Sequence, residues 1–216
     1  MKKDTVFFDL DGTLTDPGEG ITNCVMYALA SLGYPVPPRE ELHKFIGPPL
    51  LYGFKEWYSM DDATARTAVE KYRERFTKLG MFENEMYDGI PKMLALAEKS
   101  GKRLFVVTSK PEPFARTIIE YFGIESFFAD IIGANMNESR TDKEYVIESA
   151  LLRAGAEKEH TVMVGDRKYD MEGAAANGID SVGVLFGYGS KEELTEAGAG
   201  KLAATVEELT ELLCAM

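Results

Sequence analysis

The stretch Thr5–Asp16, with the sequence TVFFDLDGTLTD, decides the fold of this chain. Residues 5–8 are apolar or β-branched, which is typical of a strand buried on both faces of a parallel sheet. Asp9 and Asp11 follow at i, i+2 spacing, so their side chains leave the strand end on the same side. Two carboxylates this close repel each other strongly unless a cation lies between them. Because open α/β sheets bind ligands at the carboxyl ends of their strands, the stretch predicts a divalent metal and a reactive carboxylate there.

The composition narrows the class of protein and of partner. The 216 residues are 45% hydrophobic and 28% charged, as in ordinary globular proteins, and this length fits one core domain with a smaller insert. The formal net charge of −12 argues against nucleic acid or an anionic membrane as a partner. An anionic substrate therefore has to be attracted locally, by a metal ion, lysines and backbone N–H groups.

The cysteines and the apolar runs bear on the compartment. Cys24 and Cys214 lie far apart and belong to no metal-binding motif, so we expect two free thiols that are buried or partly buried. The apolar run near the N-terminus is too short for a secretory signal. No stretch approaches the roughly 20 apolar residues of a membrane span. These features predict a cytoplasmic protein without a membrane partner.

Alternating strand and helix patterns predict the fold. Strands are expected at 5–8, 102–109, 129–133, 161–166 and 181–185, and helices at 91–100, 114–122, 143–154, after Asp166 through Asn177, and near the C-terminus. Residues 16–84 have helical periodicity and are too long for a normal crossover. We therefore predict an α/β fold: a Rossmann-like parallel sheet core of residues 1–15 and 85–216, with an α-helical cap domain, residues 16–84, inserted over the strand ends.

Two further positions carry candidate phosphate-binding groups. Thr108 and Ser109 end the second predicted strand, where hydroxyls are also common as caps and turn formers. Beside Asp9 they form a plausible cradle for phosphoryl oxygens, together with backbone N–H groups. Lys143 lies at the start of a helix, where the helix dipole favours anions rather than a lysine. Most helix lysines are solvated, so its position alone leaves both a surface role and a binding role open.

The stretch Gly165–Asp170 is the second strong signal. Asp166 follows a buried strand, and Asp170 comes four residues later at the start of a helix, so the two carboxylates share one face. Mg²⁺ prefers about six oxygen ligands, several of them water and one or two of them carboxylates. Asp166 as a direct ligand, with Asp170 acting through water or orienting the loop, meets this demand. The alternative is that both acids only cap the helix.

These motifs together resemble the haloacid dehalogenase superfamily, most members of which are phosphatases. DLDGTLT at 9–15 resembles its first motif, and Thr108, Lys143 and Asp166 occur in the order of the others. The resemblance is closest to the phosphoglycolate phosphatase-like branch, which has a helical cap after the first strand. IGPPL at 46–50, VTSKP at 107–111 and GYGS at 187–190 look like that branch.

The resemblance implies a mechanism. Asp9 would attack phosphorus and form an aspartyl phosphate, and Asp11 would act as general acid and then general base. The implied Mg²⁺ ligands are Asp9, Asp166, the backbone carbonyl of Asp11 and, directly or through water, Asp170. The implied phosphate-binding groups are Gly12, Thr108, Ser109 and Lys143.

Several alternatives remain beside a phosphatase of small phosphate monoesters, either phosphoglycolate-like or nucleoside monophosphates. A dehalogenase needs neither Asp11 nor a metal. A non-enzymatic binding module would be expected to lack one of Asp9, Asp11, Lys143 and Asp166, and all four are present. A sugar phosphomutase shares every core motif, and a pyrophosphatase changes only the leaving group. The substrate is expected to be a small phosphorylated metabolite, and the protein a monomer or homodimer. Residues expected to contact the leaving group from the cap are Pro48, Pro49, Leu50, Lys55, Tyr72 and Arg73.

Overall fold

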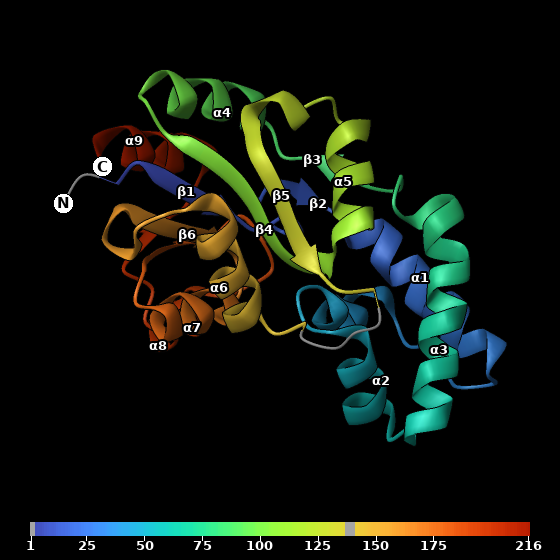
Figure 1. The fold of residues 1–216 in the computed structure, drawn as a ribbon. Coiled ribbons are helices and arrows are strands. Elements are labelled where there is room, and N and C mark those ends of the chain that lie inside the picture. Colours follow the sequence, from blue (N-terminus) through green and yellow to red (C-terminus); the bar gives the residue numbers. More distant parts are fainter. Residues whose placement is uncertain (1–2, 137–140) are drawn as a thin grey trace.

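The computed structural model describes residues 3–136 and 141–216. Within them, a parallel six-stranded sheet has the strand order β5-β4-β1-β6-β7-β8 (Figure 1). Its strands are β1 (Thr5–Phe8), β4 (Arg103–Pro111), β5 (Phe128–Ala134), β6 (Thr161–Gly165), β7 (Asp180–Val184) and β8 (Lys201–Ala203). The predicted α/β fold with a parallel, Rossmann-like sheet is confirmed.

The opening strand lies in the middle of this sheet. Phe8 is in register with Val106 of β4 on one side and with Val164 of β6 on the other. The backbone N–H of Asp9 continues the β6 ladder by donating to the carbonyl of Val164 at 2.9 Å. The segments that follow β1, β4 and β6 therefore leave the same edge of the sheet as neighbours.

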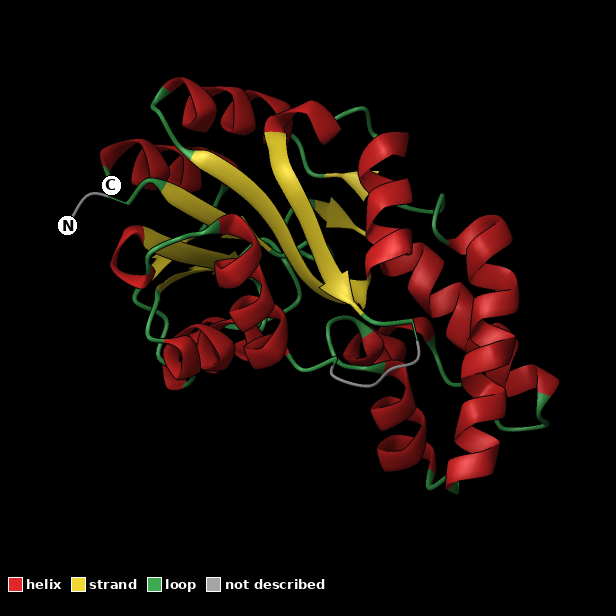
Figure 2. Cartoon of the chain, in the orientation of Figure 1, coloured by secondary structure: helices red, strands yellow, loops and turns green. Residues whose placement is uncertain are grey.

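Alternate side chains of β1 enter different halves of the core. Val6 and Phe8 belong to a cluster with helices α4 (Ile90–Lys99), α5 (Glu112–Tyr121) and α9 (Val206–Ala215) on one face of the sheet. Phe7 belongs to a separate cluster with α6 (Lys143–Ala154) and α7 (Lys168–Asn177) on the other face (Figure 2). All three side chains are fully buried. Burying each side chain stabilises the fold by about 1.5–3 kcal/mol, which holds the strand rigidly behind its terminal carboxylates.

The helical block lies off the carboxyl end of the sheet, at the right in Figure 1. Its helices are α1 (Gly18–Ser31), α2 (Leu50–Tyr58) and α3 (Asp62–Arg75), with shorter helical turns at Arg39–Phe45 and Phe76–Gly80. Asp61 caps α3, because its carboxylate accepts a hydrogen bond from the N–H of Thr64 at 2.8 Å. That these helices form a separate domain with boundaries at 16 and 84 stays a prediction.

The chain enters and leaves the helical block through two short antiparallel strands, β2 (Thr15–Asp16) and β3 (Glu85–Met86). Asp16 is thus part of a strand pair, whereas the whole of 16–84 was expected to be free of strands. The remaining short elements are helical turns at Glu125–Phe127 and Lys158–His160 and the helix α8 (Lys191–Glu196). Within the two described ranges, every helix is too short or too polar to cross a bilayer.

Three further sequence expectations were wrong. The second strand does not end at Ser109: after an irregularity in register it continues to Pro111, which pairs with Ala134. The strand at 180–184 is not the last, since β8 pairs with it in parallel. Cys214 is exposed rather than buried or partly buried, because it lies on the outer face of α9. Cys24 is buried and both thiols are free, as expected.

Candidate active site

Three buried carboxylates meet at the end of the central strands. Asp9 follows β1, Asp166 follows β6, and Asp170 lies in the first turn of α7. One oxygen from each lies within 4.8 Å of the others, and the three residues are no more than 5% exposed. The predicted grouping of these acids at one sheet edge is what the structure shows, because β1 and β6 are adjacent parallel strands.

Lys143 is the cation among these acids. Its Nζ lies 2.8 Å from Oδ1 of Asp9 and 2.8 Å from Oδ1 of Asp170, and it donates a hydrogen bond to the carbonyl of Val107 at 3.1 Å. Burial would lower the pKa of Lys143, but the charges of Asp170 and Asp9 outweigh burial and raise it. Lys143 is therefore a buried, charged bridge between two acids and not a solvated helix residue.

Asp166 is held from two sides. Its Oδ2 accepts the backbone N–H of Tyr188 at 2.8 Å, and the hydroxyl of Thr13 lies 3.4 Å from its Oδ1. Burial, and then the charges of Asp170 and Asp9, raise the pKa of Asp166 well above its ordinary value. A positive charge close to Asp166 is needed to keep this carboxylate ionised.

Gly12 makes room for Asp166. It has a φ of +83°, and a Cβ built on it would lie 2.2 Å from Oδ2 of Asp166. Any other residue would therefore clash with the carboxylate in a backbone conformation that glycine adopts most easily. Its N–H donates to the carbonyl of Thr15 at 2.7 Å. Gly12 thus leaves room for the Asp166 carboxylate. Its N–H was expected to bind phosphate, but in this structure it donates to the carbonyl of Thr15 instead.

The donor set fits a divalent cation. The carboxylates and ammonium groups gathered here belong to Asp9, Asp11, Asp166, Asp170, Lys110 and Lys143. The carboxyl groups outnumber the ammonium groups by two. Among the described residues, Oδ1 of Asp9 and Oδ1 of Asp170 accept no hydrogen bond and lie instead in ion pairs with Lys143. Buried carboxylate oxygens with this charge imbalance are what a hard dication requires.

The predicted hydroxyls lie at the same edge. Thr108 is buried, and its Oγ1 accepts a hydrogen bond from the N–H of Lys110 at 3.2 Å. Ser109 is half-buried and lines the cavity described below. The structure therefore places both beside the acids, with Ser109 facing the space where a ligand would bind.

Lys110 is a site residue that our sequence reasoning did not single out. Its Nζ lies 2.8 Å from Oδ2 of Asp11 and 4.7 Å from the ring centre of Phe76, and it is 8% exposed. Burial raises the pKa of Asp11, and the charge of Lys110 acts in the opposite direction. A signal was present in the sequence: Lys110 follows Thr108 at the same spacing as Asp11 follows Asp9, on the neighbouring strand.

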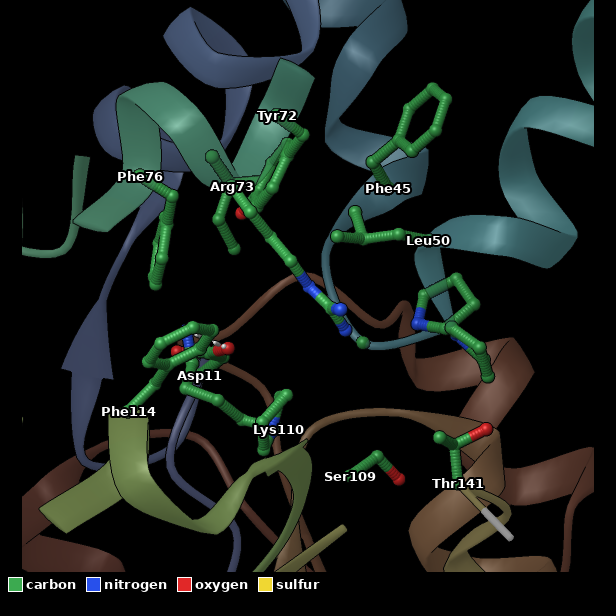
Figure 3. A pocket seen from close by; sticks show the side chains of 15 residues that line it. Asp11, Phe45, Leu50, Tyr72, Arg73, Phe76, Ser109, Lys110, Phe114 and Thr141 are labelled. Carbon is green, nitrogen blue, oxygen red and sulfur yellow. Dashed lines mark ion pairs between the residues drawn. The ribbon is translucent and has the colours of Figure 1, made fainter. Parts of the chain in front are cut away.

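A cavity with about 620 Å³ of empty space, part of it open to solvent, separates the helical block from the strand ends. Asp11, Ser109 and Lys110 line it from the sheet side. In Figure 3, Arg73 extends from α3 across the cavity toward the end of β4, which carries Ser109 and Lys110. The side chains that line it from the helical block include Phe45, Pro48, Pro49, Leu50, Tyr72, Arg73 and Phe76.

Five of the six leaving-group residues expected in the cap therefore line this cavity. Lys55 does not: it is exposed, and its Nζ pairs with Asp62 at 2.9 Å. The reason is its place on α2, where it points to the start of α3 and away from the sheet. Phe45, Phe76 and Phe114 were not anticipated, since apolar residues in helical segments are ordinarily core residues.

Comparison with known proteins identifies the family. The model of the haloacid dehalogenase-like hydrolase family matches residues 6–184. A 5'-nucleotidase of Pseudomonas aeruginosa is 46% identical over 90% of this chain and 88% of its own length. The tyrosine-protein kinase PtkA of Mycobacterium tuberculosis is 40% identical over 96% of this chain and 72% of its own length. The crystal structure of a predicted phosphatase from Clostridium acetobutylicum superposes with a TM-score of 0.97 at 41% identity and covers 100% of both chains. The predicted family is confirmed: the chain belongs to the haloacid dehalogenase-like hydrolases.

Proposed function

We propose that this protein is a Mg²⁺-dependent phosphatase that hydrolyses a small phosphate monoester through an aspartyl phosphate on Asp9. The observation that carries the proposal is the position of Asp9 at the end of a rigid strand, 2.8 Å from Lys143 and within reach of Asp166 and Asp170. The nucleotidase and phosphatase names of its relatives support the same reaction class.

In the first step, an oxygen of Asp9 attacks phosphorus while the bond to the leaving oxygen breaks. Asp11, two residues on and lining the cavity, donates the proton that the leaving oxygen needs. The burial that raises the pKa of Asp11 favours this protonated form. The products of this step are the free alcohol and the phosphorylated Asp9.

In the second step, Asp11 takes a proton from a water molecule, and the resulting oxygen attacks phosphorus. The bond between phosphorus and Asp9 breaks, which releases inorganic phosphate and regenerates the carboxylate. Lys143 holds a phosphoryl oxygen throughout, since its Nζ already contacts the attacking carboxylate. Ser109 lines the adjoining cavity, and Thr108 is buried just before it on β4.

Mg²⁺ bound by Asp9, Asp166 and the Asp11 carbonyl, with Asp170 in direct or water-mediated contact, would offset the charge between the phosphate and the attacking carboxylate. The ability of the donor set to take a dication supports this assignment. Asp11 and Asp166 together argue against a dehalogenase, which needs neither the second acid nor a metal. A pyrophosphatase and a sugar phosphomutase stay as alternatives, because they would use the same groups at the strand ends.

As the substrate we favour a nucleoside monophosphate, whose leaving group is a nucleoside, over a phosphoglycolate-like ester. The cavity has aromatic side chains at Phe45, Tyr72, Phe76 and Phe114, which offer faces and edges to a planar base. The 46% identity to a 5'-nucleotidase points the same way. Arg73 would contact polar groups of the leaving group, because its side chain reaches from α3 across the cavity in Figure 3.

A panel of phosphate esters tests this function. With Mg²⁺ present, we expect nucleoside 5'-monophosphates to give the highest kcat/KM, followed by phosphoglycolate and p-nitrophenyl phosphate, with pyrophosphate lowest. Chelation should remove the activity, and added Mg²⁺ should restore it. Full phosphatase activity in the presence of chelator would contradict the Mg²⁺ dependence, and a metal-independent dehalogenase would again be an alternative. A preference for pyrophosphate would leave the chemistry intact and overturn the substrate class.

Arg73→Ala should change the ranking of these substrates and leave p-nitrophenyl phosphate hydrolysis within about tenfold, or roughly 1.4 kcal/mol of barrier. Lys143→Ala should lower kcat/KM for every substrate alike, by on the order of 10²–10³-fold, because it removes a positive charge beside the phosphoryl group that is transferred. Lys55→Ala is the matched control, a cap lysine outside the cavity that should change nothing. An Arg73→Ala loss as uniform and severe as that of Lys143→Ala would contradict this division of roles.

Lys110→Met should shift the alkaline limb of the kcat/KM profile to higher pH. The first step needs Asp11 protonated, so activity falls as pH rises through the pKa of Asp11. Lys110 opposes the rise of that pKa, and its removal lets the pKa increase further. Lys55→Met provides a control with the same chemical change. A limb that stays in place or moves to lower pH would show that Asp11 is not the acid.

A further inference from the structure

The loop after β7 lies directly on Asp166. The backbone N–H of Tyr188 donates to Oδ2 of Asp166 at 2.8 Å. The preceding Gly187 approaches so closely that a Cβ built on it would lie 2.4 Å from the Cβ of Asp166 and 2.3 Å from the carbonyl oxygen of Gly12. A shift of this loop therefore moves a hydrogen bond to a carboxylate that we assign to the metal.

The side chain of Tyr188 points the other way, to the helical block. Its hydroxyl donates a hydrogen bond to Oδ1 of Asp16, and its ring lies edge-on to His43 with the ring centres 5.5 Å apart. Asp16 is where the chain enters the helices, and the same Oδ1 accepts the N–H of Gly18, the first residue of α1, at 2.9 Å. Burial raises the pKa of the Tyr188 phenol, so the hydroxyl stays a neutral donor.

Arg167, which directly follows Asp166 in the chain, makes a second contact with the helical block. One Nη1 donates to the carbonyl of Ile46, in the segment between the turn at 39–45 and α2. Its Nε lies 2.9 Å from Oε1 of Glu193, so the guanidinium is anchored to the sheet side by α8 as well. Its backbone N–H donates to Oδ2 of Asp170 at 3.1 Å. Tyr188, which donates a hydrogen bond to Asp166, and Arg167, which follows Asp166 in the chain, thus both also contact residues of the helical block.

We propose that Tyr188 and Arg167 are positioning residues that couple closure of the helical block to the orientation of Asp166. When the helices lie over the cavity, the Tyr188–Asp16 and Arg167–Ile46 hydrogen bonds hold in place the loop after β7 and the start of α7, which lie on either side of the Asp166 carboxylate. When the helices move away, the ties to Asp16 and Ile46 are lost, and the N–H of Tyr188 is free to shift. A ligand that holds the helices closed therefore strengthens metal binding, and by linkage the metal strengthens ligand binding by the same factor. The inference rests on the proposed function for the role of Asp166.

Tyr188→Phe isolates the coupling, because it removes the bond to Asp16 and keeps the ring and the backbone N–H. Mg²⁺ binding is measured by calorimetry with and without orthovanadate as the phosphate mimic. We expect the Kd for Mg²⁺ with vanadate to rise about fivefold, as for loss of one net hydrogen bond of about 1 kcal/mol. Without vanadate the Kd should stay within about twofold of wild type. By the same linkage, the Kd for vanadate at saturating Mg²⁺ should also rise about fivefold, and in turnover assays the Mg²⁺ activation constant should rise.

Arg167→Met should act in the same direction through the second tie. Tyr87→Phe is the matched control: Tyr87 lines the same surface hollow as Tyr188, packs its ring on Phe186 with 5.2 Å between ring centres, and should leave both Kd values unchanged. Melting temperatures of all variants, measured without ligands, report any general loss of stability.

Each outcome has a defined meaning. If vanadate strengthens Mg²⁺ binding equally in wild type and Tyr188→Phe, the coupling is wrong and the proposed function stands. If Tyr188→Phe weakens Mg²⁺ binding equally with and without vanadate, Tyr188 has only a structural role and the coupling is again wrong. If wild type binds no Mg²⁺ under either condition, the proposed function and this inference both fail.

Discussion

Asp9→Asn is expected to reduce kcat by on the order of 10⁵-fold, the scale of losing a covalent nucleophile. Asparagine has the same shape but no carboxylate to attack phosphorus. It also removes one of the two charges that contact Lys143, so ligand binding and stability are measured alongside turnover.

The control for Asp9→Asn is a measurement that the variant still folds. Asp9 follows β1 and donates its backbone N–H to Val164, which the substitution keeps. The core behind it is formed by Val6, Phe7 and Phe8. We therefore expect a wild-type far-UV circular dichroism spectrum and a cooperative melt. Retention of a tenth of wild-type activity by a folded Asp9→Asn protein would mean that Asp9 is not the covalent centre.

Asp166→Asn is expected to raise the Mg²⁺ concentration needed for half-maximal activity by about 100-fold or more. Changes to groups that only support a metal ligand cost about 10–100-fold in metal affinity, and a direct ligand should exceed that range. Asp170→Asn should raise the requirement less, because Asp170 already accepts the N–H of Arg167 and pairs with Lys143. Mg²⁺ titrations of activity measure both. An Asp166→Asn enzyme with a wild-type requirement would remove Asp166 from the metal site.

The strand-end acids could be predicted because they depend on simple geometry. Neighbouring parallel strands end at one edge of the sheet, so buried runs that end in Asp9 and in Asp166 bring those carboxylates together whatever the rest of the chain does. Lys143 could be placed only through the resemblance to the family. Its position at a helix start is equally compatible with solvent, and only packing of α6 against the sheet buries it.

Other features depend on tertiary contacts that local patterns do not encode. The strand β8 has three residues and forms because β7 offers it a free edge. Tyr188 was noted as part of GYGS, but its bond to Asp16 joins residues 172 positions apart. Lys55 and Arg73 are both basic residues of the helical block, and only the packing of α2 and α3 shows that one pairs with Asp62 while the other reaches the cavity. Long-range contacts of this kind decide which candidate residues touch a ligand.

The central claim is that the phosphoryl group is transferred to Asp9, as an aspartyl phosphate, before water releases it. The most direct measurement is a rapid acid quench of the enzyme during turnover, followed by borohydride reduction and peptide mass spectrometry, since an acyl phosphate is reduced to an alcohol and a free carboxylate is not. The account predicts that the aspartate at position 9 is reduced to homoserine, only when substrate and Mg²⁺ are both present. Reduction at another carboxylate, or none at position 9 while substrate is being hydrolysed, would contradict it.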